Sequence, residues 1–271
     1  MDINSKEKLI HEIRERINDS IDLSKDYTDE EIREVITGEV FKASKEHYLS
    51  IGEKKEITDV IFNSMRRLDV LQPIIDDKSI TEIMINGPDT IFVEKDGRIF
   101  KKDVRFESRR KLEDVIQTIV SKVNRTVNES NPIVDARLTD GSRVNVVLPP
   151  IALNGPIVTI RKFPEKPMTM ERLIKFGSVT EEVAEVLNRM VRAKYNIFIS
   201  GGTGSGKTSF LNALSNFIPK DERIITIEDS AELQITGIEN IVRLETRNAN
   251  TEGKGEITIR DLIKASLRMR P

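Results

Sequence analysis

The chain has 271 residues, and its 43 basic and 45 acidic residues leave a formal net charge of −2, which argues against a surface dominated by nucleic-acid binding. Cysteine is absent, which excludes disulfide bonds, thiolate metal sites and a cysteine nucleophile. Because there is neither an apolar run of 18 residues nor a signal-peptide pattern, we expect a cytoplasmic protein, with peripheral attachment to a membrane complex left open.

The first part of the chain, residues 1–71, is predicted to be a charged helical region. Thr28 and Glu31 have the spacing of a capping box. The apolar stripes are narrow, so the helices either form a small bundle or pack against another domain or a partner. The stripes are Leu9, Ile13 and Ile17; Ile32, Val35 and Ile36; and Ile57, Val60, Ile61, Met65 and Leu68.

After Pro73 the apolar residues change period, and residues 72–163 are predicted to form an α+β domain with a mainly antiparallel sheet. Two hairpins are expected at the turn sequences Asp96-Gly97 and Asp140-Gly141. Strands are expected at residues 80–86, 91–94, 98–101, 134–138, 143–148 and 157–163, with an amphipathic helix over 112–123.

Pro164 and Pro167 indicate a linker over 164–179, and strands then alternate with helices over 180–271, which predicts a parallel α/β sheet. A helix begins at Thr180, and a second begins with a capping box of Thr258 and Asp261. Expected strands are 196–200, 223–227 and 241–244, and the inward residues of the first helix are Val183, Val186, Leu187, Met190 and Val191.

Residues 201–208, GGTGSGKT, match the phosphate-loop pattern G-x-x-x-x-G-K-[ST], between an expected strand and an expected helix. The alternatives are a glycine-rich turn that binds no ligand and a dinucleotide-binding turn. The latter requires G-x-G-x-x-G, whereas here G-x-G-x-G is followed by a lysine.

The phosphate loop predicts a site for ATP and Mg²⁺. Lys207 is expected to reach the β- and γ-phosphates, and the Thr208 hydroxyl is expected to ligate Mg²⁺. The predicted nucleotide-binding residues are Gly201, Gly202, Thr203, Gly204, Ser205, Gly206, Lys207, Thr208 and Ser209.

Two further groups of charged residues are candidates for the chemistry. Glu228 and Asp229 end the expected strand after the phosphate-loop helix, where a carboxylate orients water or supports Mg²⁺; the alternative is an acidic, exposed strand end. Arg137, Arg143 and Arg161 lie on or beside expected strands, and their forked guanidinium groups suit a γ-phosphate, although spacing alone favours a solvated strand face.

Together these motifs resemble a known family, the ATPases of the type II/type IV secretion superfamily, and within it the CpaF/TadA-type proteins of Flp (Tad) pilus assembly. The resemblance covers nearly the whole chain and is weaker over the first 60 residues. The matching segments are ITEIMINGP (80–88), VDARLTDGSRVNVVLPP (134–150), IRKF (160–163), SGGTGSGKTSFLNALSNFIP (200–219), ITIEDSAELQI (225–235), VRLETR (242–247) and EGKGEITIRDLIKASLRMRP (252–271).

The resemblance implies a motor subunit that hydrolyses ATP to power pilus assembly or protein secretion, with a RecA-like P-loop domain over 180–271. It implies a homohexamer on the cytoplasmic side of the inner membrane, with membrane platform proteins as partners and no direct nucleic-acid contact. Lys207 and Glu228 would be catalytic, Thr208 and Glu228 would support the metal, and the three arginines would lie near the phosphates at a domain or subunit interface.

Two other functions stay open, a conjugative DNA-export ATPase and a scaffold that binds ATP without hydrolysing it. In the resembled family a Walker B strand with a second catalytic acid follows the segment that here ends at Pro271. We therefore expect an incomplete ATPase domain, which binds nucleotide but hydrolyses it poorly.

Overall fold

The computed structural model describes residues 3–21, 25–122, 126–163, 167–202, 204–247, 249 and 254–270. The chain divides into two compact units, Met1–Phe163 and Pro164–Pro271. Thr203, Val123, Pro164 and Pro271, which the sequence predictions used, lie outside the described residues, as do residues 165–166 of the expected linker and 252–253 of the last matching segment. Among the described helices, none combines the length and the apolar character needed to cross a membrane.

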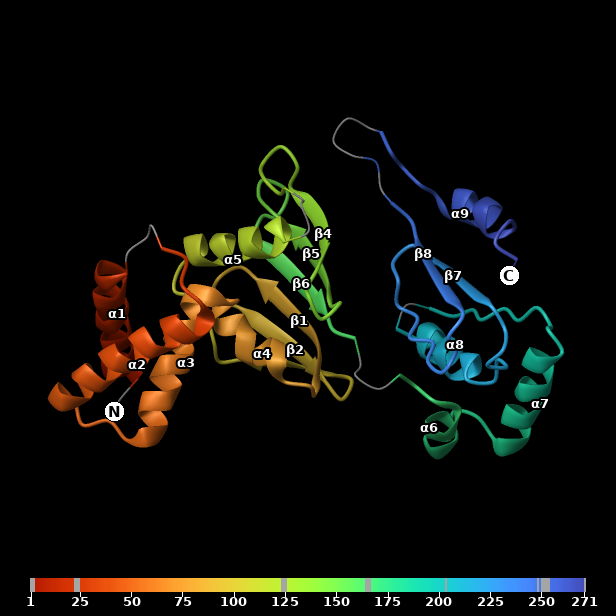
Figure 1. The fold of residues 1–271 in the computed structure, drawn as a ribbon, viewed down its shortest axis with the longest axis horizontal. Helices are drawn as coiled ribbons and strands as arrows, with labels where there is room; N and C mark the ends of the chain where they lie inside the picture. The colour runs from red at the N-terminus through yellow and green to blue at the C-terminus, as the bar shows by residue number, and fades with distance from the viewer. Residues whose placement is uncertain are drawn as a thin grey trace. The chain divides into compact units, whose positions relative to one another are not determined.

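The first unit begins with three helices, α1 (Ile3–Ser20), α2 (Asp29–Glu46) and α3 (Ile51–Arg66) (Figure 1). Their apolar stripes pack together in one cluster. Thr28 and Glu31 form the predicted capping box of α2. The helices therefore form a bundle with a core of its own, although Val60 is 38% exposed. Its buried residues include Leu9, Ile13, Ile17, Ile32, Ile36, Val40, Ile57, Ile61 and Phe62.

A six-stranded antiparallel sheet follows, in the order β3-β2-β1-β6-β5-β4. Both predicted hairpins are confirmed, β2 with β3 and β4 with β5. Pro73, after which the apolar residues change period, lies in the first turn of the short helix α4 (Gln72–Asp76), where its missing N–H breaks no helical hydrogen bond. The strands are β1 (Ile80–Asn86), β2 (Ile91–Lys95), β3 (Arg98–Lys102), β4 (Ile133–Arg137), β5 (Arg143–Val147) and β6 (Ile157–Arg161).

One face of this sheet is covered by α5 (Arg109–Ser121), which begins at the N-cap Ser108 (Figure 1). Strand residues alternate, so that one set packs in the core and the other faces away from it. The core includes Ile83, Ile85, Val144, Val146, Val158 and Ile160 from the strands and Leu112, Ile116 and Ile119 from α5.

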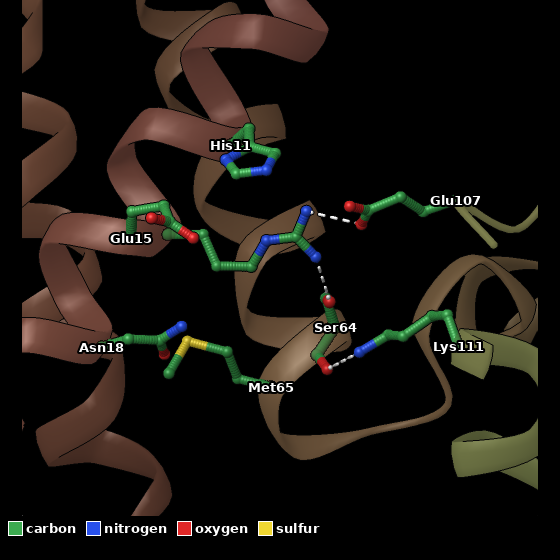
Figure 2. A pocket seen from close by; sticks show the side chains of 8 residues that line it. His11, Glu15, Asn18, Ser64, Met65, Glu107 and Lys111 are labelled. Atoms are coloured by element: carbon green, nitrogen blue, oxygen red, sulfur yellow. Dashed lines mark hydrogen bonds and ion pairs between the residues drawn. The ribbon is translucent and has the colours of Figure 1, made fainter.

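The bundle meets the sheet domain through polar contacts beside a cavity of about 390 Å³ (Figure 2). Arg14 of α1 donates from Nη1 to Ser64 Oγ at 3.1 Å and from Nη2 to Glu107 Oε2 at 2.7 Å. Lys111 of α5 donates from Nζ to the Ser64 carbonyl oxygen at 2.9 Å. Residues far apart in the sequence are thus joined within this unit.

The second unit contains a parallel pair of strands, β7 (Ile224–Glu228) and β8 (Ile241–Glu245), with Glu228 opposite Glu245. Its apolar cluster is formed by residues from α6, α7 and α8, including Met170, Leu173, Ala184, Ala213 and Leu214. The helices are α6 (Met170–Lys175), α7 (Glu181–Arg192), α8 (Lys207–Ser215) and α9 (Ile259–Ser266). The predicted caps Thr180 of α7 and Thr258 of α9 are confirmed.

The predicted buried strand at residues 196–200 is wrong. Ile197 and Ile199 pack partly into the apolar cluster, but Phe198 is 98% exposed and no described segment pairs with this stretch. A strand requires a neighbour that exchanges backbone hydrogen bonds, and apolar character alone does not supply one. The predicted inward face of α7 is also wrong in part, because Val183 and Val186 are exposed.

Candidate phosphate-binding site

The backbone of the phosphate loop leads directly into α8, whose N-cap is Gly206 with φ 88°. Gly204 has φ 75°, so both glycines adopt left-handed conformations that other residues rarely adopt. A Cβ at Gly201 would lie 2.6 Å from Ser205 Oγ. The left-handed conformations of Gly204 and Gly206 therefore favour glycine at these two positions, whereas a Cβ at Gly201 would displace only the hydroxyl of Ser205. The path of the loop brings backbone N–H groups and the N-terminus of a helix to one place.

Lys207, the first residue of α8, turns back over this loop. Its Nζ donates hydrogen bonds to the carbonyl oxygens of Gly201, at 2.9 Å, and Gly202, at 2.6 Å. These carbonyl oxygens hold the ammonium group beside the loop, where a phosphate would find both the charge and the backbone donors.

Thr208 contacts a carboxylate that the sequence predictions did not include. Its Oγ1 donates to Glu232 Oε2 at 3.3 Å. Glu232 follows β7 by four residues, in the segment that turns back from the end of that strand.

Glu228, the last residue of β7, anchors this turn. Its Oε2 accepts hydrogen bonds from the backbone N–H groups of Glu232, at 2.7 Å, and Leu233, at 2.9 Å. Its Oε1 is buried and has no hydrogen-bond partner among the described residues. The far end of the turn is held by Asn212 of α8, whose Oδ1 accepts from Gln234 N at 2.8 Å.

The donor set fits Mg²⁺ held together with nucleotide phosphates. The described residues contain no cluster of three or more His, Cys, Asp or Glu side chains that could hold a metal by themselves. Mg²⁺ does not require such a cluster, because it keeps several waters and uses one or two carboxylates plus phosphate oxygens. The Thr208 hydroxyl and the Glu232 carboxylate that it contacts supply oxygen ligands of the correct kind. The buried Glu228 oxygen without a partner lies at the start of the same turn.

Three arginines form a row across adjacent strands of the first unit. Arg143 pairs with Arg137 on one side and with Arg161 on the other, and Arg161 pairs with Glu82 of β1. Direct cross-strand partners point to the same face, and this row alternates with the core residues of the sheet. The structure thus aligns three residues that the sequence could place only on separate strands.

The other predicted site residues are Asp229 and the rest of the phosphate loop. Asp229 accepts hydrogen bonds from Thr246 Oγ1 through its carbonyl oxygen, at 3.1 Å, and its Oδ1, at 3.4 Å. Gly202, Ser205 and Ser209 lie in or next to the loop as the motif requires, whereas Thr203 lies outside the described residues. The sequence predictions missed Glu232 and Asn212; the available signal was the recurrence of a glutamate four residues after Glu228.

Residues 65–271 match the family described as "Type II/IV secretion system protein", and the chain belongs to this family. The uncharacterized protein MJ0781 of Methanocaldococcus jannaschii is 37% identical over 251 residues, which cover 89% of this chain and 34% of that protein. The conjugal transfer protein TrbB of Rhizobium radiobacter is 30% identical over 208 residues, which cover 75% of this chain and 61% of that protein. The chain therefore spans only part of the length of these relatives.

A solved structure supports the fold. The pilus retraction motor PilT with bound ADP has a TM-score of 0.51 and 20% sequence identity, over 74% of this chain and 57% of that chain. At this identity the likeness concerns the fold alone.

Proposed function

We propose that this chain is an ATP-binding and ATP-hydrolysing motor subunit that powers pilus assembly or protein secretion. The observation that carries the proposal is the phosphate loop of residues 201–208, which enters α8 through the left-handed Gly206 with Lys207 folded over it. The family of the chain supports the same function.

In the proposed site, each residue has a distinct role. The loop amides and Lys207 bind the phosphates, and the Thr208 hydroxyl lies at the metal position. Glu228 orients the attacking water with the carboxylate oxygen that does not hold the backbone. Mg²⁺, when bound with ATP, neutralises negative charge that develops on the phosphate oxygens.

We further propose that residues 180–271 are a RecA-like ATPase domain, joined by the linker 164–179 to the α+β domain 72–163 and the helical region 1–71. The proposed subtype is the CpaF/TadA type, acting as a homohexamer with inner-membrane platform proteins at the cytoplasmic face. In that assembly Arg137, Arg143 and Arg161 would approach the phosphates at a domain or subunit interface.

A second candidate is a conjugative ATPase that exports DNA. The likeness to the conjugal transfer protein TrbB favours it. The motor chemistry would be unchanged, so the two candidates differ in cargo and not in the site.

Calorimetric titration with ATP tests the nucleotide site. We expect Lys207→Ala to weaken binding by about 2–3 kcal/mol, because a charge-assisted contact with phosphate is lost. The matched control is Lys220→Ala, an exposed lysine of the same unit, which should bind as the unaltered chain does. Equal affinities for the Lys207 variant and the unaltered chain would refute the assignment.

A further inference from the structure

The contact between Thr208 and Glu232 identifies a carboxylate at the metal position of the phosphate loop. In P-loop ATPases, Mg²⁺ is held by the loop Ser or Thr hydroxyl together with an acidic residue. Here the Thr208 hydroxyl already donates to Glu232 Oε2 at 3.3 Å. An acidic partner for Thr208 is thus present between β7 and β8.

The Glu228 carboxylate holds the backbone of the turn that carries Glu232. Its Oε2 accepts two backbone hydrogen bonds, from Glu232 and Leu233, at 2.7 and 2.9 Å. The same bonds fix the backbone from which the Glu232 side chain extends. Glu228 therefore determines where Glu232 lies, and only its Oε1 is left for another role.

The position of the turn is fixed from α8 as well. Thr208 and Asn212 are four residues apart in α8 and so lie on one face of the helix. Thr208 contacts Glu232, and Asn212 Oδ1 accepts from Gln234 N at 2.8 Å. Glu232 and Gln234 are therefore both held against one face of α8. These two contacts place the Glu232 carboxylate beside Thr208.

We infer that Glu232, and not Glu228, is the carboxylate that supports Mg²⁺ beside Thr208, while Glu228 holds the turn and faces the reacting water. This inference rests on the proposed function, since it assigns roles within the same site. It divides between two glutamates the roles that the sequence assigned to Glu228 alone.

The test compares Glu232→Gln with Glu228→Gln by calorimetric titration with ATP, once with Mg²⁺ and once with a chelator. For the unaltered chain, the ratio of the ATP affinities with and without Mg²⁺ measures how much Mg²⁺ strengthens ATP binding, which is called the Mg²⁺ gain below. Loss of a carboxylate that supports a bound metal typically costs 10–100-fold in metal affinity, so we expect Glu232→Gln to lose about 10-fold or more of this gain. Its affinity for ATP without Mg²⁺ should not change.

Glu228→Gln should keep the Mg²⁺ gain, because an amide oxygen still accepts the backbone N–H groups of Glu232 and Leu233. Glu239→Gln, an exposed glutamate of the same unit, is the matched control for loss of one negative charge. If Glu232→Gln does not fold, as judged by circular dichroism, Glu232→Asp replaces it; its shorter side chain withdraws the carboxylate from Thr208 and should also reduce the gain.

The outcomes separate this inference from the proposed function. If the unaltered chain does not bind ATP, the proposed function fails, and the inference fails with it. If the unaltered chain binds ATP and Glu232→Gln retains the full Mg²⁺ gain, or if Glu228→Gln alone loses it, only the inference is overturned.

Discussion

Arg14 of α1 and Glu107, which precedes α5, form an ion pair of 2.7 Å that connects the helical bundle to the sheet domain. The Arg14 side chain is only 22% exposed, whereas that of Glu107 is 53% exposed. The same guanidinium donates to Ser64 Oγ of α3 at 3.1 Å, so that a single side chain joins three segments of the first unit (Figure 2).

We expect Arg14→Ala to loosen α1 and to lower stability by about 1 kcal/mol, because a half-exposed partner is screened by solvent. Hydrogen exchange measured by mass spectrometry should show faster exchange in α1. Arg16→Ala is the control, since its contact with Glu46 is longer, at 3.9 Å, and more exposed. Exchange in α1 that is equally slow in the Arg14 variant and the unaltered chain would contradict the prediction.

Asp69 is a buried carboxylate, 9% exposed, at a position with φ 53°. Burial raises the pKa of Asp69 above its ordinary value, although Lys111 and Arg14 oppose this shift. The folded state thus binds the proton more tightly than the unfolded state, and its stability falls as pH rises from the ordinary aspartate pKa through the raised value.

We therefore expect Asp69→Asn to be more stable than the unaltered chain at pH 7, with a difference that shrinks as pH approaches 4. Asparagine tolerates the left-handed conformation, so the substitution adds no backbone strain. Thermal melting of both proteins across this pH range measures the difference. A difference that is independent of pH would show that ionisation of Asp69 does not destabilise the fold.

Gly87 has φ +78°, and a Cβ at this position would lie 3.0 Å from the carbonyl oxygen of Asn154. We expect Gly87→Ala to destabilise the sheet domain by about 1–2 kcal/mol, from the left-handed conformation alone. Gly38→Ala in α2, where no atom lies within 4 Å, is the control and should be stabilising. Chemical denaturation of the two variants gives the comparison, and equal midpoints would rule out strain at Gly87.

The arginine row gives a prediction for the homohexameric motor that we propose. Alanine at Arg137, Arg143 or Arg161 should lower ATP turnover, by about 10³-fold for a residue that stabilises the charged transition state, with nucleotide affinity nearly unchanged. Arg98→Ala, on the opposite edge strand β3, is the control. Unaltered turnover in all three single variants would show that these arginines are solvated residues of a strand face, without a role in hydrolysis.

Local elements of this protein could be predicted from the sequence because their chemistry is local. A capping box needs residues three apart, as with Thr28 and Glu31, and a tight hairpin needs Asp-Gly at its turn. The phosphate loop is likewise a contiguous segment, whose glycines and lysine specify both the backbone and the charge.

Contacts between distant segments were decided only by the tertiary structure. The apolar stretch 196–200 had the composition of a strand but no described neighbour to pair with. The arginine row depends on the register of β4, β5 and β6, which apolar periodicity does not specify across strands. The carboxylate at Thr208 depends on a turn held by Glu228 and Asn212, because hydrogen bonds between distant residues determine which of two nearby glutamates reaches the loop.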